Sequence, residues 1–279
     1  MLVPLAGGGQ ETLLSEVGFV LLPLFSTADA CALRLVCREF LAAVTEHPWE
    51  DRETHIRGSI AAWRACFPHA RCANVQGSDR MGVATRAHPL ADADFVHFEG
   101  VRELYMAGCT KVTDAAFAHL RGIFTLDMSF CYQATITDAA FAHLAGIQRL
   151  SIASCFQGTI TDAAFLHLRG IQLLNMSFCR QLTDAAFLHL RDIHTLYMSW
   201  CDQPAITDAA FVHLRGIHTL VMDFCSQAAI TGASLYCLKG LSLFGMRECS
   251  DDAIATAQSL GLPVLTEGGT WGALTYEPQ

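Results

Sequence analysis

The stretch TDAAFLHLRGIQLLNMSFC, from Thr161 to Cys179, recurs along most of the chain with small changes. A Thr-Asp pair opens five of the copies, with Thr231-Gly232 as an echo of it, and a cysteine closes each copy. Successive cysteines stand 22 or 24 residues apart. The cysteines of this series are Cys109, Cys131, Cys155, Cys179, Cys201, Cys225 and Cys249. A fixed period of this length is typical of a solenoid, in which each unit buries its apolar face against its neighbours.

Each copy predicts a short strand followed by a short helix. The apolar pattern L-x-x-L-x-L-x-x-C, here Ile147, Leu150, Ile152 and Cys155, puts alternate side chains on one face of a strand. This spacing is the signature of a leucine-rich repeat. The predicted fold class is therefore an α/β leucine-rich-repeat solenoid, with parallel strands on the concave face and short helices on the convex face.

The helical half of the repeat follows from its own residues. Thr161 suits a helix N-cap, and Asp162 brings negative charge to the first turn. Phe165 and Leu168 share one face of the helix, and Gly170 ends it. The regular aspartates of the repeats are therefore interpreted as helix-start residues and not as a catalytic set.

Composition indicates a large core, because 52% of the 279 residues are hydrophobic and only 16% are charged. The formal charge of −9 belongs to the repeats, since residues 91–279 hold ten Lys and Arg against eighteen Asp and Glu. An acidic repeat region argues against nucleic acid as a partner. The apolar run from Val17 to Phe25 is too short to span a membrane, so no membrane association is expected.

The cysteines indicate a reducing compartment. Because the repeat cysteines occur in register, we expect them to stack as small, buried hydrophobic side chains. They would remain free thiols only in a reducing environment. No Lys or Arg precedes Arg34, so the charged region of a signal peptide is missing. The sequence predicts an intracellular protein, in cytoplasm or nucleus, that is not secreted.

The segment before the repeats has helical spacings interrupted by Pro23 and a Ser-Thr pair, and Ser26 or Thr27 is expected to cap a helix. Its motifs are an apolar run from Leu21 to Phe25, the segment LRLVCREF from Leu33 to Phe40, and a closing Pro48-Trp49. Together these motifs resemble the F-box family, which implies a small helical domain that docks a Skp-type adaptor.

The chain divides into five predicted segments. They are a flexible lead at 1–10, an F-box-like domain at 11–50, a connecting helix and atypical capping repeat with a loop at 51–90, leucine-rich repeats at 91–265 and a tail at 266–279. Residues 50–66 are expected to form the connecting helix, and the cap should direct Ala70, Ala73 and Val75 inward. The last helix is expected from Asp251 to about Leu260, with an edge strand at Pro263–Leu265.

The repeats resemble the cysteine-containing leucine-rich-repeat family on the segment CRQLTDAAFLHL, Cys179 to Leu190. An F-box followed by such repeats is similar to the substrate receptors of SCF ubiquitin ligases. The resemblance implies a non-catalytic subunit that binds a Skp-type adaptor and an unknown target protein. The alternative is a plain interaction scaffold whose N-terminal helices only cap the solenoid. The candidate adaptor-binding residues are Leu14, Val17, Leu21, Leu24, Leu33, Val36 and Phe40.

Two columns of the repeats are candidates for target binding. One is the exposed set of strand residues on the concave face. The other is the residue before each cysteine, where aromatic side chains could form a partner-binding patch or pack against the next turn. The candidate residues are Tyr105, Asp127, Phe130, Arg149, Asn175, Phe178, Tyr197, Trp200, Asp223 and Phe224.

A column of helix histidines invites a metal-binding interpretation; it contains His97, His119, His143, His167, His189 and His213. One imidazole per repeat, without Asp, Glu or Cys at helical spacing beside it, does not converge on a zinc ion. Neither nucleotide-binding glycine motifs nor C-x-x-C or H-E-x-x-H occur. We therefore expect no metal, no cofactor and no enzyme active site.

Overall fold

A computed structural model describes residues 21–76 and 89–266 of the chain. Contacts divide it into two compact units, Met1–Asn74 and Val75–Gln279. The division falls within the segment 51–90 that the sequence assigned to a connection and cap. Leu14, Val17, the predicted lead and the tail beyond Thr266 lie outside the described residues.

The first unit is mainly helical. Its second helix starts with a reciprocal pair of hydrogen bonds, because Ser26 Oγ accepts from the Asp29 amide at 3.2 Å and the Asp29 carboxylate accepts from the Ser26 amide at 3.3 Å. Ser26 is thus the cap. The elements are η1 (Leu22–Leu24), α2 (Thr27–Leu33), α3 (Arg38–Glu46), α4 (Ile60–Cys66) and β1 (Cys72–Asn74).

The predicted helix at 50–66 is wrong in its first half, since only α4 (Ile60–Cys66) is helical. Ser59 caps α4, and its hydroxyl accepts a backbone hydrogen bond at 3.3 Å. Upstream, the Ile56 amide donates to the Asn74 carbonyl at 2.7 Å. This pairing beside β1 uses a backbone group that a helix would need, so the chain before Ser59 is extended.

Trp49 is the centre of the first unit's core and is 1% exposed. Its indole Nε1 donates to the Val44 carbonyl at 2.8 Å, so burial leaves no polar group unpaired. Its ring meets Phe67 edge-on at 5.7 Å between centroids. The buried cluster comprises Leu22, Ala30, Val44, Trp49, Phe67 and Ala70.

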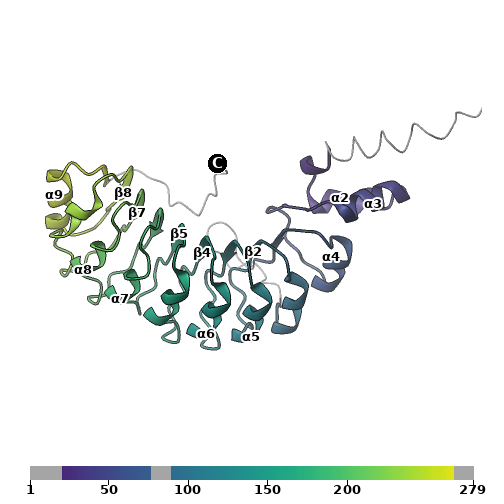
Figure 1. Ribbon diagram of the computed structural model, residues 1–279, viewed down its shortest axis with the longest axis horizontal. Coiled ribbons are helices and arrows are strands. Elements are labelled where there is room, and N and C mark those ends of the chain that lie inside the picture. Colours follow the sequence, from purple (N-terminus) through teal and green to yellow (C-terminus); the bar gives the residue numbers. More distant parts are fainter. Residues whose placement is uncertain (1–20, 77–88, 267–279) are drawn as a thin grey trace, which may run out of the picture. The chain divides into compact units, whose positions relative to one another are not determined.

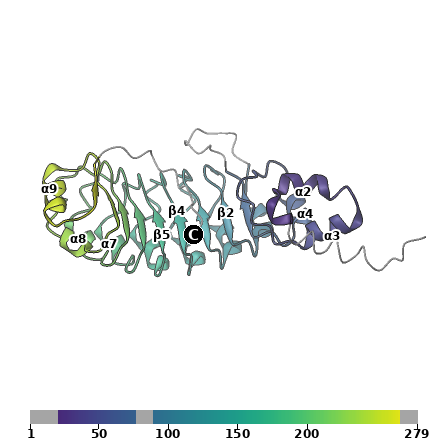
Figure 2. The same ribbon diagram turned by 90° about the horizontal axis from the view of Figure 1, so that it is seen from above.

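The second unit is a series of parallel strands in register. Leu150 of one strand pairs with Leu174 of the next, and both side chains are fully buried. The same leucine position recurs along the sheet. Figures 1 and 2 show these strands side by side, with the helices on the other side of each repeat. The strands are β2 (Glu103–Tyr105), β3 (Thr125–Asp127), β4 (Arg149–Ser151), β5 (Leu173–Asn175), β6 (Thr195–Tyr197), β7 (Thr219–Val221), β8 (Leu243–Gly245) and β9 (Val264–Leu265).

The helices of the repeats are short and begin at the predicted threonine. Thr161 Oγ1 accepts from the Ala163 amide at 3.2 Å, and Gly170 ends the unit with φ of +83°. The helices are η2 (Asp92–Phe98), α5 (Asp114–Phe117), η3 (Ala118–Leu120), α6 (Asp138–Phe141), η4 (Ala142–Leu144), η5 (Asp162–Leu168), α7 (Asp184–Phe187), α8 (Asp208–Phe211), η6 (Leu235–Leu238) and α9 (Asp251–Ser259). Several are one turn long, so tertiary packing must hold them.

The repeat aspartates do more than the predicted helix-start role. Asp138 accepts hydrogen bonds from both the amide and the hydroxyl of Thr161 in the next repeat, each at 2.7 Å. The same bond joins five other neighbouring pairs, namely Asp92–Thr113, Asp114–Thr137, Asp162–Thr183, Asp184–Thr207 and Asp208–Thr231. Each aspartate therefore links one repeat to the next.

The predicted end of the repeats is confirmed, with α9 starting at Asp251 and β9 formed by Val264–Leu265. Among the helices of the described residues, none has the length and apolar character needed to cross a bilayer. All twelve cysteines are free thiols.

Candidate functional site

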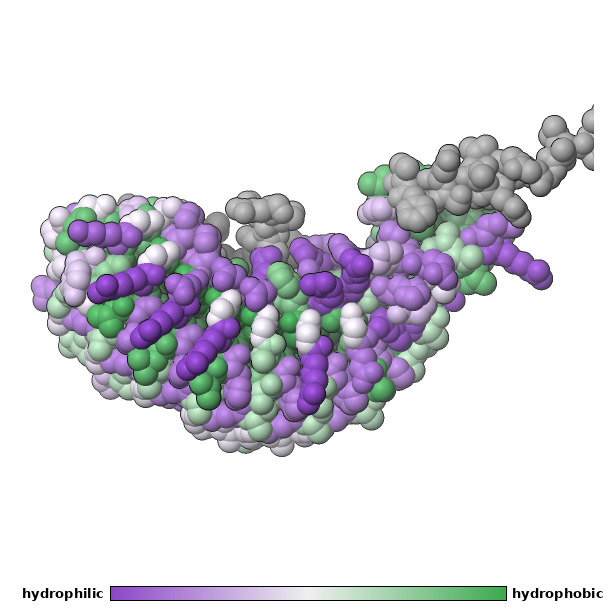
Figure 3. All heavy atoms as spheres, viewed as in Figure 1, coloured by the Kyte–Doolittle hydropathy of each residue, from purple (hydrophilic) through white to green (hydrophobic). Residues whose placement is uncertain are grey.

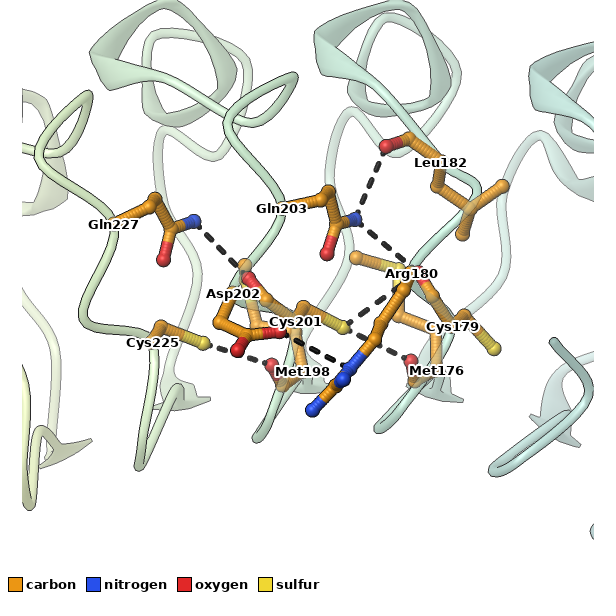
Figure 4. A network of polar contacts seen from close by, with 10 residues as sticks. All are labelled: Met176, Cys179, Arg180, Leu182, Met198, Cys201, Asp202, Gln203, Cys225 and Gln227. Atoms are coloured by element: carbon orange, nitrogen blue, oxygen red, sulfur yellow. Dashed lines mark hydrogen bonds and ion pairs between the residues drawn. The ribbon is translucent and has the colours of Figure 1, made fainter.

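The loop after each strand is held by side chains that bond to the previous repeats. Cys201 Sγ donates to the Met176 carbonyl at 3.2 Å, and Gln203 Nε2 donates to the Cys179 and Leu182 carbonyls at 3.2 and 3.0 Å (Figure 4). Equivalent bonds recur along the stack. The repeat cysteines are thus buried, as expected, but they also donate hydrogen bonds, which the sequence pattern did not indicate.

Burial suppresses ionisation of these thiols. It raises the pKa of Cys109, Cys201 and Cys249 to about 12. For Cys179 burial is again the largest cause, and the neighbouring Cys201 adds to it, so the pKa lies well above its ordinary value. These cysteines are structural and unreactive while the repeats are folded.

This network fixes an unusual backbone at the residue before each cysteine. All seven residues of this column have φ between 53° and 76°, in the left-handed region; they are Gly108, Phe130, Ser154, Phe178, Trp200, Phe224 and Glu248. A residue with a Cβ is strained there by about 1–2 kcal/mol, and only glycine is not. Aromatic side chains at four of these positions are therefore retained against a local cost, which points to a use for them.

The aromatic rings of this column stack on one another. Phe178 and Trp200 are parallel within 11°, with 5.6 Å between centroids, and Trp200 and Phe224 are parallel within 8° at 4.2 Å. Phe178 is 37% exposed, and Trp200 and Phe224 are partly exposed. Each ring therefore packs on its neighbour, as one of the two sequence interpretations expected, and keeps an outer surface. The other interpretation, a partner-binding patch, stays a prediction.

Sequence reasoning missed two further aromatics, Tyr132 and Phe156, which directly follow repeat cysteines. Their rings are parallel within 6° at 5.6 Å, and both are more than half exposed. The sequence does contain a signal for them, because both follow the cysteine directly in successive repeats. We name the six residues of both columns the aromatic edge: Phe130, Tyr132, Phe156, Phe178, Trp200 and Phe224.

A shallow groove interrupts the aromatic edge where Ser154 replaces an aromatic residue. Ser154, Phe156, Phe178 and Arg180 line it. Arg180 forms an exposed ion pair with Asp202 at 3.1 Å (Figure 4). The edge thus offers flat apolar faces with one polar pair beside them, which suits a protein side chain better than a small charged ligand.

The predicted concave-face residues are partly committed to bonds within the chain. Tyr105 and Asp223 are only 5% and 6% exposed. The Asp223 carboxylate accepts from Arg247 Nε and Nη2 at 3.0 and 2.8 Å. Asn175 Oδ1 accepts from the Ser177 amide at 3.0 Å. These side chains have less free surface for a partner than the aromatic edge has.

The other three concave-face candidates, Asp127, Arg149 and Tyr197, are partly buried and partly exposed. Burial raises the pKa of Asp127 above its ordinary value, although Ser129 donates two hydrogen bonds to its carboxylate. Burial likewise raises the pKa of Tyr197, against the opposing effect of the Arg149 charge. At neutral pH Tyr197 is therefore a neutral phenol beside a cation.

In the first unit, the most exposed apolar side chains lie in the turn between α2 and α3 and at the end of η1. Leu35 and Val36 of the turn are 88% and 66% exposed, and Leu24, the last residue of η1, is 78% exposed. Of the other predicted adaptor-binding residues, Leu21 is 41% exposed, and Leu33 and Phe40 are partly buried. Sequence reasoning selected Val36 and missed its neighbour Leu35.

The histidine column has no metal-like geometry where the structure describes it. Within residues 21–76 and 89–266, no three His, Cys, Asp or Glu side chains lie close enough together to hold a metal ion. His119 contacts the Glu99 carboxylate of the preceding repeat at 2.7 Å. For His189, burial lowers the pKa, and the Arg169 charge lowers it further against the opposing effect of Asp162.

Comparison with solved structures agrees with this geometry. The TLR13–ssRNA13 complex matches with a TM-score of 0.52 and 15% sequence identity, over 72% of this chain and 33% of that one. The repeats form a leucine-rich-repeat solenoid. The Drosophila Toll–Spatzle complex matches at a TM-score of 0.49 and 10% identity, over 79% of this chain and 36% of that one. The yeast Rad7–Elc1 complex matches at 0.36 and 12% identity, over 92% of both chains.

At 15% identity, the TLR13 similarity shows the fold alone. The chain spans about a third of the length of the TLR13 and Toll chains. No protein-family model matches the sequence, and no curated protein matches it.

Proposed function

We propose that the chain is the non-catalytic substrate-recognition subunit of a cullin-RING (SCF) ubiquitin ligase. In this proposal the first unit docks a Skp-type adaptor, the repeats bind a target protein, and other subunits transfer ubiquitin. It would act inside the cell, where its twelve free cysteines stay reduced.

The observation that carries this proposal is the exposed apolar surface of the first unit. Its core closes around Trp49 without Leu24, Leu35 or Val36. Burying such a side chain stabilises a complex by about 1.5–3 kcal/mol, so leaving three of them in water favours a partner. Val36 also lies in the segment that resembles the F-box motif, which supports a Skp-type adaptor as that partner.

Co-purification of the full chain with a Skp-type adaptor tests the docking step. Val36→Asp and Leu24→Asp should each abolish adaptor binding, because a charge would be buried at the interface. Leu166→Asp is the matched control, since Leu166 is 47% exposed on η5 and should keep full binding. Failure of the unaltered chain to bind the adaptor would overturn the proposed ligase role. The alternative function, an interaction scaffold made of leucine-rich repeats, would then be favoured.

The aromatic edge is the surface that best supports target binding. Four of its six rings are retained at strained backbone positions, whereas Asn175 and Asp223 on the concave face bond within the chain. Large aromatic side chains also contribute most strongly to protein interfaces.

Proximity labelling in cells can distinguish the two surfaces. The double variant Phe178→Ala/Phe224→Ala should lose the proteins labelled specifically by the unaltered chain, while Asn175→Ala/Tyr197→Ala should keep them. The adaptor should remain labelled in both variants. Loss of targets only in the concave-face variant would contradict the assignment to the aromatic edge.

A further inference from the structure

A second column of the repeats, at the opposite end of each strand, is basic. It is formed by the residue directly before the glycine or aspartate that ends the helical half of each unit. Although acidic residues outnumber basic ones after residue 90, five of the ten Lys and Arg of that region stand in this column. From the first repeat onward the column reads Glu99, Arg121, Ala145, Arg169, Arg191, Arg215 and Lys239.

The last four members follow one another without interruption, and we name Arg169, Arg191, Arg215 and Lys239 the basic row. Because the strands are in register, neighbouring members are offset by about one strand spacing, ~4.8 Å. Figure 3 looks onto this side of the repeats, where a line of strongly hydrophilic side chains crosses successive units. All four side chains are exposed.

The basic row has no acidic partner of its own. Within the described part of the chain, none of its members makes an ion pair, whereas Arg180 and Arg247 pair with Asp202 and Asp223. One acid, Asp192, is adjacent in sequence, and the aspartates at the helix starts bond to threonines of the next repeat. Like charges held about one strand spacing apart repel one another, so an anion would be attracted to the row.

The repeat does not need a cation at this position. Basic residues after a helix favour its dipole, but Ala145 and Glu99 occupy the same place in other repeats, and both units have the same helix and strand. The stacking of the repeats therefore does not require the four consecutive cations.

We propose that the basic row docks an extended acidic polypeptide segment. Three guanidinium groups can each bind a carboxylate through two parallel hydrogen bonds. The row spans three strand spacings, about 14 Å, which matches a segment of only a few extended residues. This site is separate from the aromatic edge and does not depend on adaptor docking.

Nucleic acid fits the same surface less well. A longer polyanion would pass beyond the row onto a chain with a formal charge of −9. Stacking platforms for bases also need a run of aromatic rings beside the cations. The row positions themselves hold Arg and Lys, and three residues after Arg191 and Arg215 stands one stacked pair of rings, His194 and His218, with 4.6 Å between centroids. A short acidic segment needs neither feature.

Fluorescence anisotropy with a labelled Glu-rich peptide of about twelve residues tests the proposal on the full chain at about 50 mM salt. The variant Arg169→Ala/Arg191→Ala/Arg215→Ala should bind at least about tenfold more weakly. Its fold should be intact, because Ala145 already occupies this position in another repeat. The matched control Arg57→Ala/Lys111→Ala/Arg180→Ala removes the same charge at exposed positions outside this column and should change the affinity less than about twofold.

The charge-retaining variant Arg191→Lys/Arg215→Lys should lie between the two, because it keeps the charge and loses the paired hydrogen bonds. Equal weakening in the row variant and the control would overturn the proposal, since binding would then reflect net charge alone. Tighter, row-dependent binding of a single-stranded oligonucleotide of equal charge, or of vesicles containing anionic lipid, would also overturn it.

Discussion

The buried cysteines predict that the repeats lose stability above about pH 9. The pKa of Cys201 is 9.0 ordinarily and about 12 when buried in the folded chain. As the pH rises between these values, the unfolded state releases the thiol proton while the folded state keeps it, so the unfolded state is favoured. Below pH 9 both states keep the proton and the full stability is present.

The magnitude follows from the same pKa difference. Each such thiol lowers the free energy of unfolding by about 1.4 kcal/mol per pH unit in this window. Cys109, Cys201 and Cys249 together contribute a loss on the order of 4 kcal/mol at about pH 10, and the more deeply buried thiols add to it. This loss is a large fraction of the stability of a typical domain, about 5–15 kcal/mol.

Urea denaturation under reducing conditions, followed by circular dichroism from about pH 7 to pH 10, measures this dependence. Cys201→Ala should be less stable at neutral pH, because it loses the bond to the Met176 carbonyl, but its stability should fall less steeply above pH 9. Ser177→Ala, which changes a repeat residue without removing a thiol, should leave the slope unchanged. Identical alkaline slopes for the unaltered chain and Cys201→Ala would refute the reasoning.

Three further predictions concern stability. Asp162→Ala should lower the free energy of unfolding by about 1.5–3 kcal/mol, because two hydrogen bonds to a charged group are lost, whereas Asp252→Ala should change it by less than about 1 kcal/mol; urea titration compares them. Trp49→Ala should cost about 3–5 kcal/mol, seen as an earlier loss of near-ultraviolet dichroism and proteolysis within the first unit. Ser26→Ala removes the cap of α2 and should cost about 1 kcal/mol, measured as faster hydrogen exchange in that helix. Unchanged stability in any of these variants would contradict the corresponding contact.

The repeat architecture was predictable because stacking imposes it on every copy. The period, the inward leucines and the threonine caps are properties of local spacing, and Leu150 and Thr161 take their expected roles. The failed half of the 50–66 helix shows the limit of such reasoning. Its segment is held by the distant Asn74 carbonyl, and no local pattern contains that contact.

The candidate sites were less predictable than the fold. The alternation of residues along a strand indicates which face a side chain occupies, but it does not give the sign of φ. The backbone strain at Phe178 and Trp200 could therefore not be predicted from the sequence. It also does not show that Asp223 bonds to Arg247 within the chain. Both facts depend on neighbouring repeats, and together they favour the aromatic edge over the concave face.

The aromatic edge and the basic row can differ in chemistry because contacts inside the stack join neighbouring repeats. The aspartate–threonine bonds, the cysteine bonds and the leucine stack are nearly the same in each unit, so stability depends on them. The residues before the cysteines and those before the glycine or aspartate that ends each helical half contribute none of these conserved bonds. They vary from Gly108 to Trp200 and from Ala145 to Arg191. Because stability is close to a sum over units and their interfaces, these edge positions can change without unfolding the stack. Variation concentrated there is therefore the expected location of binding specificity, with an aromatic surface where the strands end and a basic one where they begin.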